Sequence, residues 1–172
     1  MRAYRFMLMA VIILATCAGC GTRYVDSKQP GAAIVKFQNQ TSGYFIVHRY
    51  AGDERCTEQE GIGMLEPGAE KAIKFEPRRI ATFAFGYLDG GATCSYAGSF
   101  MPKENQSYVV LMADDTGNCY LSVRRGADAA SGIREPSYVR REYKQPFVAS
   151  QGFCSVLDEG AKKALESAAA SP

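Results

Sequence analysis

The chain has 172 residues, of which 47% are hydrophobic and 22% are charged, and a formal net charge of +2. This length is typical of one domain, and the composition is that of a globular protein rather than a disordered one. Arg2 and Arg5 account for the positive excess, so the chain from residue 20 onward is formally neutral. A neutral chain has no general attraction for a phosphate backbone, and we expect no nucleic-acid partner.

The N-terminus combines a basic start, an uncharged run and a cysteine. Residues 6–18 form a run of 13 residues without charge, which suits a secretory signal and is shorter than the roughly 20 residues of a spanning helix. The run leads into Ala18 and Gly19, two small residues that directly precede Cys20. This pattern resembles the leader of bacterial lipoproteins, which the lipoprotein signal peptidase cuts before the cysteine.

The resemblance implies that residues 1–19 are a signal peptide and that Cys20 becomes a lipid-carrying N-terminus. Cys17 is a second candidate, although the threonine before it is a poorer residue at the cleavage position. Gly21 stands where an aspartate would resemble an inner-membrane retention signal. The resemblance therefore implies a protein anchored by lipid to the outer membrane and facing the periplasm. Residues 20–31 are expected to be a lipidated tether, of which residues 21–31 reach at most about 40 Å.

Alternating apolar residues dominate the next part of the chain, with turn signals at roughly 8–12-residue spacing. About seven short strands are expected, near residues 33–37, 44–50, 72–75, 80–88, 94–100, 107–113 and 119–124. An edge strand is possible within 138–147. The pattern predicts a mainly β protein, with an antiparallel β-sandwich or small barrel over residues 32–156.

The spacing of apolar residues changes from that of a strand to that of a helix near the C-terminus. Leu157, Ala161 and Leu165 fall on one helical face, and Asp158 and Glu159 suit a helix N-terminus. We expect a short helix and a frayed tail over residues 157–172. The Pro-Gly turns between strands also resemble those of small β-sandwich lipoproteins of Gram-negative bacteria, a resemblance that implies no activity.

Four cysteines follow the leader, namely Cys56, Cys94, Cys119 and Cys154. An even number in an exported chain predicts two disulfides, and the absence of a C-x-x-C pair disfavours a metal site. Buried free thiols are the alternative. If the strands at 94–100 and 119–124 flank a third in a simple meander, Cys94 and Cys119 lie about 9–10 Å apart, too far for a bond. This argument favours Cys56–Cys94 with Cys119–Cys154.

Basic residues gather late in the chain and form a possible interaction patch, which consists of Arg124, Arg125, Arg134, Arg140, Arg141 and Lys144. In the envelope such a patch suits lipid phosphates, an anionic glycan or an acidic partner. An ordinary mixed surface is the alternative interpretation. Tyr44, Ile46, His48 and Tyr50 form a second candidate surface on one strand face, which is either a binding row or a face that the protein itself covers.

No catalytic constellation is apparent. His48 is the only histidine, and no serine or cysteine nucleophile stands in a recognisable motif. We expect no enzymatic activity, no metal and no cofactor. The expected function is a membrane-anchored, non-enzymatic binding or structural module for an envelope protein or polymer. The alternative is a periplasmic inhibitor or a small-ligand-binding lipoprotein.

Overall fold

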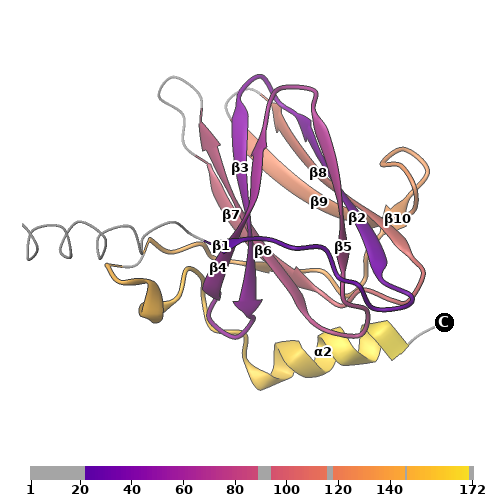
Figure 1. Cartoon of the computed structure of the whole chain (residues 1–172). Helices are drawn as coiled ribbons and strands as arrows, with labels where there is room; N and C mark the ends of the chain where they lie inside the picture. The colour runs from indigo at the N-terminus through magenta and orange to yellow at the C-terminus, as the bar shows by residue number, and fades with distance from the viewer. Residues whose placement is uncertain (1–21, 89–93, 116–117, 146, 171–172) are drawn as a thin grey trace, which may run out of the picture.

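Two β-sheets pack face to face in the computed structural model, which describes residues 22–88, 94–115, 118–145 and 147–170 (Figure 1). The elements are β1 (Thr22–Arg23), β2 (Ala33–Gln40), β3 (Tyr44–Gly52), β4 (Thr57–Leu65), β5 (Glu70–Phe75), β6 (Ala81–Leu88), β7 (Ser95–Phe100), β8 (Ser107–Asp115), β9 (Asn118–Arg125), β10 (Ile133–Arg134), β11 (Val139–Arg141), the 3-10 turn η2 (Ala149–Gln151) and the helix α2 (Glu159–Ala170).

One sheet has six strands in the order β1-β4-β3-β6-β7-β11, and the other has five in the order β10-β9-β8-β2-β5. Both sheets are mixed, because β1 runs parallel to β4 and β2 runs parallel to β8. The other strand pairs of the described residues are antiparallel. The predicted mainly β sandwich with a short C-terminal helix is therefore confirmed.

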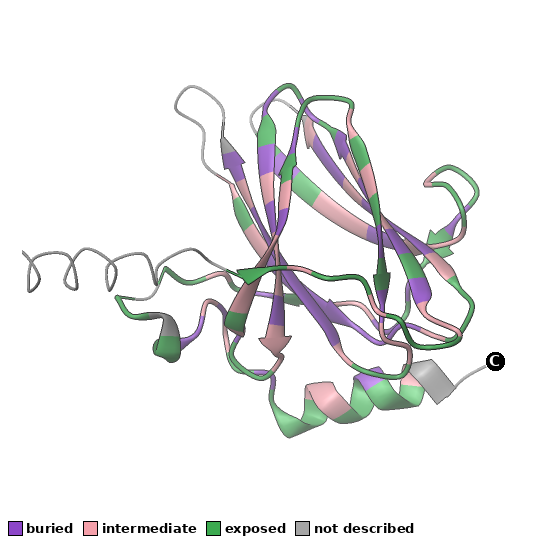
Figure 2. Ribbon diagram, viewed as in Figure 1, coloured by how far each residue is buried: buried purple, intermediate pink, exposed green. Residues whose placement is uncertain are grey.

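Aromatic side chains fill the space between the sheets. The inward positions of β2 illustrate the pattern, because Ala33 and Val35 are buried whereas Ile34 between them is exposed, and Phe37 is again buried. Phe37 meets Phe83 and Phe85 from the opposite sheet with ring centroids 5.9 Å apart in edge-to-face contact. Figure 2 shows the buried residues lining the inner faces of both sheets. In a chain without tryptophan, phenylalanine and tyrosine supply the bulk of the core.

The strand β4 is absent from the sequence prediction. Its sequence is polar and contains Gly61 and Gly63, so neither period two nor a hydrophobic run marks it. The pairing of β3 with β4 is also shifted between Val47 and His48, where Gly63 has a φ of 140°. Pairing with β3 on one side and β1 on the other, rather than local sequence, makes this segment a strand.

The disulfides join Cys56 to Cys154 and Cys94 to Cys119, with Cα atoms 5.5 Å and 6.2 Å apart. Two disulfides were predicted correctly, but the favoured pairing of Cys56 with Cys94 was wrong. The error lies in the assumed meander, because β7 belongs to the six-stranded sheet whereas β8 and β9 belong to the five-stranded sheet. Cys94 and Cys119 thus face each other across the sandwich instead of lying two strands apart in one sheet.

A C-terminal strap, residues 141–145 and 147–157, crosses the outer face of the six-stranded sheet. It covers a small second core in which Tyr50 packs against Phe153 with ring centroids 5.5 Å apart. Backbone bonds from Phe153 N to Cys56 O and from Leu157 N to Glu54 O attach the strap to the chain before β4. The disulfide between Cys56 and Cys154 closes the same contact covalently.

The helix α2 continues from the strap and runs along one end of the sandwich (Figure 1). Asp158 Oδ1 accepts a hydrogen bond from Ala161 N at 2.7 Å and so caps the helix N-terminus, as its sequence predicts. Leu157 and Leu165 are buried against Met101, which gives the helix its apolar face. No helix of the described ranges is long and apolar enough to cross a membrane.

Residues 22–29 lie on the sandwich and do not form the free tether that the sequence predicts. Thr22 stands opposite Glu60 of β4, and Tyr24 N donates to Gly61 O at 3.0 Å. Lys74 N in β5 then donates to Asp26 Oδ1 at 3.0 Å. Because these bonds connect an edge of each sheet, the segment belongs to the folded domain, and any spacer to a lipid is shorter than expected.

Candidate binding sites

The structure separates the six basic residues of the predicted patch. Arg141 is only 3% exposed and attaches the strap, because its guanidinium donates to the backbone oxygens of Asp53, Glu54 and Ser155. Burial lowers the pKa of Arg141 to about 10, so the side chain remains positive at neutral pH. Arg141 is thus a structural residue of the interior and takes no part in a surface patch.

Arg125 and Lys144 are also separated from the other basic residues of the patch. Arg125 lies 4.0 Å from the buried carboxylate of Glu135, and Lys144 lies on the strap, 4.0 Å from Glu142. Glu135 also accepts hydrogen bonds from the backbone and the hydroxyl of Ser137, which fix it inward. The carboxylate next to Arg134 in sequence is therefore not available to neutralise that arginine.

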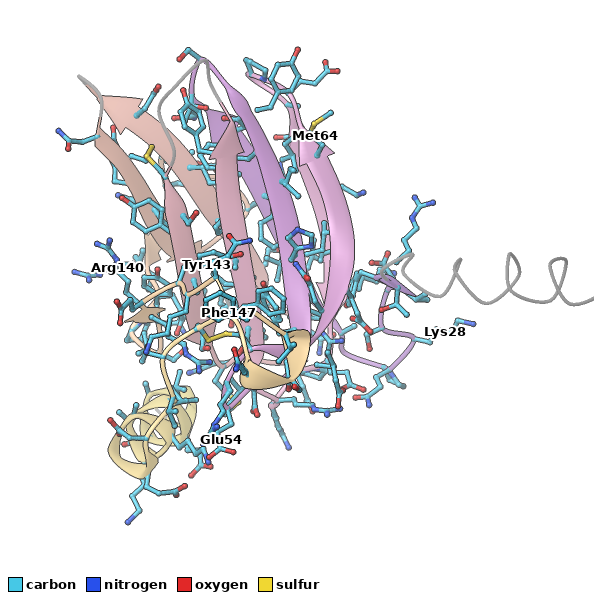
Figure 3. The ribbon with its side chains drawn as sticks, turned by 90° about the vertical axis from the view of Figure 1, so that its left-hand side faces the viewer. Lys28, Glu54, Met64, Arg140, Tyr143 and Phe147 are labelled. Atoms are coloured by element: carbon cyan, nitrogen blue, oxygen red, sulfur yellow. A yellow bond between two sulfur atoms is a disulfide. The ribbon has the colours of Figure 1, made fainter. Side chains whose placement is uncertain are left out.

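The other three arginines surround Tyr138, and we call Arg124, Arg134, Arg140 and Tyr138 the arginine seam. They come from β9, β10 and β11, where an edge of the five-stranded sheet meets an edge of the six-stranded one. Arg124, Arg134 and Tyr138 line a hollow of about 250 Å³. The guanidinium carbon of Arg140 lies 4.6 Å from the ring centroid of Tyr96, and Figure 3 shows Arg140 at the margin of the sheet.

The arginine seam carries positive charge without an acidic partner. Within the described ranges, no carboxylate lies within 4.0 Å of Arg124, Arg134 or Arg140. The hydroxyl of Tyr138 is buried and has no hydrogen-bond partner among the residues that the structure describes. Burial raises the pKa of Tyr138 to about 12, although the charges of Arg140 and Arg134 act in the opposite direction. The arrangement suits an anion bound between arginines.

A second site, which we call the Tyr143 groove, lies between the strap and the outer face of β3, β6 and β7. Its volume is about 400 Å³, and its lining includes Ile46, His48, Ala84, Gly86, Ser95, Tyr143 and Gln145. A Cβ atom built on Gly86 would meet nothing within 4 Å, so this glycine leaves the floor of the groove open. The antiparallel β-bridge between the backbones of Tyr143 and Cys154 holds this wall of the groove in place.

The residues of the predicted aromatic row have different surroundings in the structure, and only some of them line the Tyr143 groove. The structure covers Tyr50 with the strap, whereas Tyr44 at the other end of the row is 44% exposed. His48 lies between them and lines the groove. Sequence reasoning missed the opposite wall, because Tyr143 is about a hundred residues away and no local pattern connects it with β3.

His48 makes the groove polar without making it charged. Burial lowers the pKa of His48 below its usual value, so the imidazole is neutral at pH 7. Its Nδ1 atom is buried and has no hydrogen-bond partner among the described residues. Among the residues that the structure describes, no charged side chain lines the groove. A neutral group that combines an apolar face with a hydrogen-bonding atom therefore suits this site better than an anion.

The lipidation candidate Cys20 and the signal peptide, residues 1–19, lie outside the described residues. Within the part that the structure describes, no group of three His, Cys, Asp or Glu side chains is placed to hold a metal ion.

The structure is a disulfide-bonded β-sandwich with two separate candidate sites, the positively charged arginine seam and the uncharged Tyr143 groove. No protein-family model matches the chain, and no curated protein matches it.

Proposed function

We propose that this protein is a membrane-anchored envelope lipoprotein that acts without catalysis, by binding an anionic envelope polymer or an acidic envelope protein. The arginine seam is the observation that carries the binding proposal, since Arg124 and Arg134 line one hollow and Arg140 lies close by against Tyr96, all three without acidic partners among the described residues. Two disulfides support an oxidising compartment. The leader that precedes Cys20 supports export and attachment to the outer membrane, on its periplasmic side.

Replacement of Cys20 by alanine is expected to remove the protein from the membrane fraction. The wild-type chain should carry acyl groups on Cys20, which mass spectrometry of its N-terminal peptide detects. Cys17→Ala provides the matched control, because that cysteine lies within the segment that the leader resemblance assigns to the signal peptide. If the Cys20→Ala variant stays with carbonate-washed membranes as the wild type does, lipid anchoring at Cys20 is wrong.

Charge reversal in the arginine seam is expected to weaken binding to an anionic polymer. The probe is purified peptidoglycan sacculi, whose peptides carry free carboxylates, in a sedimentation assay over a range of salt concentrations. Arg134→Glu with Arg140→Glu should weaken binding about tenfold or more, since each arginine contributes about 1 kcal/mol near an anionic surface.

The matched control for the seam variant is Lys28→Glu with Lys163→Glu, which makes the same change in net charge at two exposed positions elsewhere. This control should bind nearly as well as the wild type. Equal losses in the two double variants would mean that net charge alone, and not the arginine seam, governs binding.

The Tyr143 groove favours a second candidate function, that of a small-ligand-binding lipoprotein. The groove is larger than the hollow of the arginine seam, and His48, whose buried Nδ1 atom has no hydrogen-bond partner among the described residues, is one of its lining residues. The two functions do not exclude each other, because the groove and the seam involve different residues. Gly86→Val would fill the groove floor and leave the seam unchanged, so it separates the two sites.

A further inference from the structure

Phe147 is the most exposed large apolar side chain of the described residues, with 100% of its surface accessible, and Val148 beside it is 54% exposed. Removal of a phenylalanine side chain from water stabilises a protein, and Phe147 gains none of this stabilisation within the domain. The other phenylalanines of the described ranges are buried or half-buried. Phe147 is therefore available to an apolar environment outside the chain.

Phe147 lies at the tip of the strap, residues 147–152, which hydrogen bonds hold in a defined conformation. Phe147 N donates to Gln151 Oε1 at 3.3 Å, and Gln151 N donates to Val148 O at 3.0 Å. Gly152 closes the tip with a φ of 81°, and a Cβ atom built there would lie 2.1 Å from Arg55 O. The tip is thus pressed against the chain at Arg55, next to the disulfide between Cys56 and Cys154.

The strand β4 connects this tip with the start of the folded chain. Phe153 N donates to Cys56 O directly before β4, and Thr22 stands opposite Glu60 within it. Glu60 lies four positions after Cys56, which corresponds to at most about 13 Å along the strand. Cys20 precedes Thr22 by two residues, which span at most about 7 Å. Figure 1 shows the start of β1 and the segment around η2 on the same side of the sandwich.

We propose that Phe147 and Val148 insert into the interfacial layer of the membrane that holds the lipid on Cys20. The proposal rests on the proposed function, because lipidation of Cys20 brings this side of the domain to the bilayer. With residues 22–29 attached to the sandwich, too little chain remains for the domain to stand far from its anchor. Figure 3 faces this side of the molecule, with Phe147 toward the viewer.

The commitment to a lipid surface comes from the apolar tip and its proximity to the anchor. Charge near the tip is mixed, since the exposed residues Arg55 and Lys144 are accompanied by the exposed residues Glu54 and Glu142. Electrostatic attraction to anionic lipids is therefore small here, and the aromatic side chain supplies the membrane contact. Large apolar residues next to a polar surface are typical of segments that lie in the interface.

The chain contains no tryptophan, so Phe147→Trp introduces a single fluorophore at the tip. The full-length lipidated variant is purified from membranes and placed in vesicles of phosphatidylethanolamine and phosphatidylglycerol, with and without brominated acyl chains. Tyr120→Trp is the matched control, since Tyr120 is 51% exposed on β9 of the opposite sheet. The emission of F147W should shift to shorter wavelength and be quenched by brominated lipid, whereas that of Y120W should not change.

The outcomes separate the two proposals. If the purified chain carries no acyl group on Cys20, the proposed lipoprotein function fails. If Cys20 is acylated and the emission of F147W in brominated vesicles matches that of Y120W, the membrane contact of Phe147 is overturned while lipidation stands. Quenching of F147W alone, in a chain acylated on Cys20, supports the contact.

Discussion

Replacement of Cys56 and Cys154 by serine is expected to lower the free energy of unfolding by about 4.7 kcal/mol, which is the loop-closure value for the loop that this disulfide closes. The two cysteines are 98 residues apart, whereas Cys94 and Cys119 are 25 residues apart. The same relation gives about 3.5 kcal/mol for the double serine variant of the shorter loop. Urea denaturation of both variants and the wild type, followed by far-UV circular dichroism, measures the difference.

The order of the two losses is the informative result. The longer loop includes all strands from β4 to β11, so its bridge restricts the unfolded chain most, and it also holds the strap over Tyr50. If the variant that lacks Cys94 and Cys119 is the less stable one, loop closure does not dominate, and the direct connection between the two sheets is the stronger contribution.

The second large effect is expected for Arg141→Met, which should lower the free energy of unfolding by about 3 kcal/mol. Methionine fills much of the same space but donates no hydrogen bond, so the backbone oxygens of Asp53, Glu54 and Ser155 lose the partner that Arg141 supplies. An unpaired buried polar group costs about 1–3 kcal/mol. The strap should also become more accessible, which amide hydrogen exchange in residues 141–157 detects.

Arg140→Met is the matched control, because it makes the same chemical change one residue earlier at an exposed position. Its effect should remain within about 0.5 kcal/mol, as is usual for surface substitutions. Arg141→Lys should fall between the two, because an ammonium group cannot reproduce the planar fork of the guanidinium. Equal stability of the two methionine variants would contradict the role assigned to Arg141.

The contrast between Arg140 and Arg141 also shows why the predicted patch could be recognised only in part. Charge and spacing alone place the two arginines in one group, but successive residues of a strand point to opposite faces. The structure directs Arg141 into the interior and leaves Arg140 beside Tyr96 at the surface. Glu135 in turn is directed toward Arg125, which leaves Arg134 without that partner.

The Tyr143 groove could not be predicted because its two walls are distant in sequence. His48 and Gly86 belong to paired strands of the sandwich, and their neighbouring positions follow from the register of β3 with β6. Tyr143 reaches the same place only because the chain returns over the sheet after β11. There Tyr143 forms a backbone β-bridge with Cys154, which a disulfide joins to Cys56. Long-range pairing of this kind leaves no trace in local composition.

The amino-acid sequence by itself determined the β class, most of the strands, the capped terminal helix and the presence of two disulfides. These properties depend on residues close together in the chain, such as the alternation around Val35 and Phe37 or the aspartate at 158, because period and capping are local. Tertiary structure alone decided which strands belong to which sheet, how the cysteines pair, that β4 is a strand, and that residues 22–29 lie on the sandwich. Each of these depends on which distant segments meet, and burial and backbone pairing across the whole domain determine that choice.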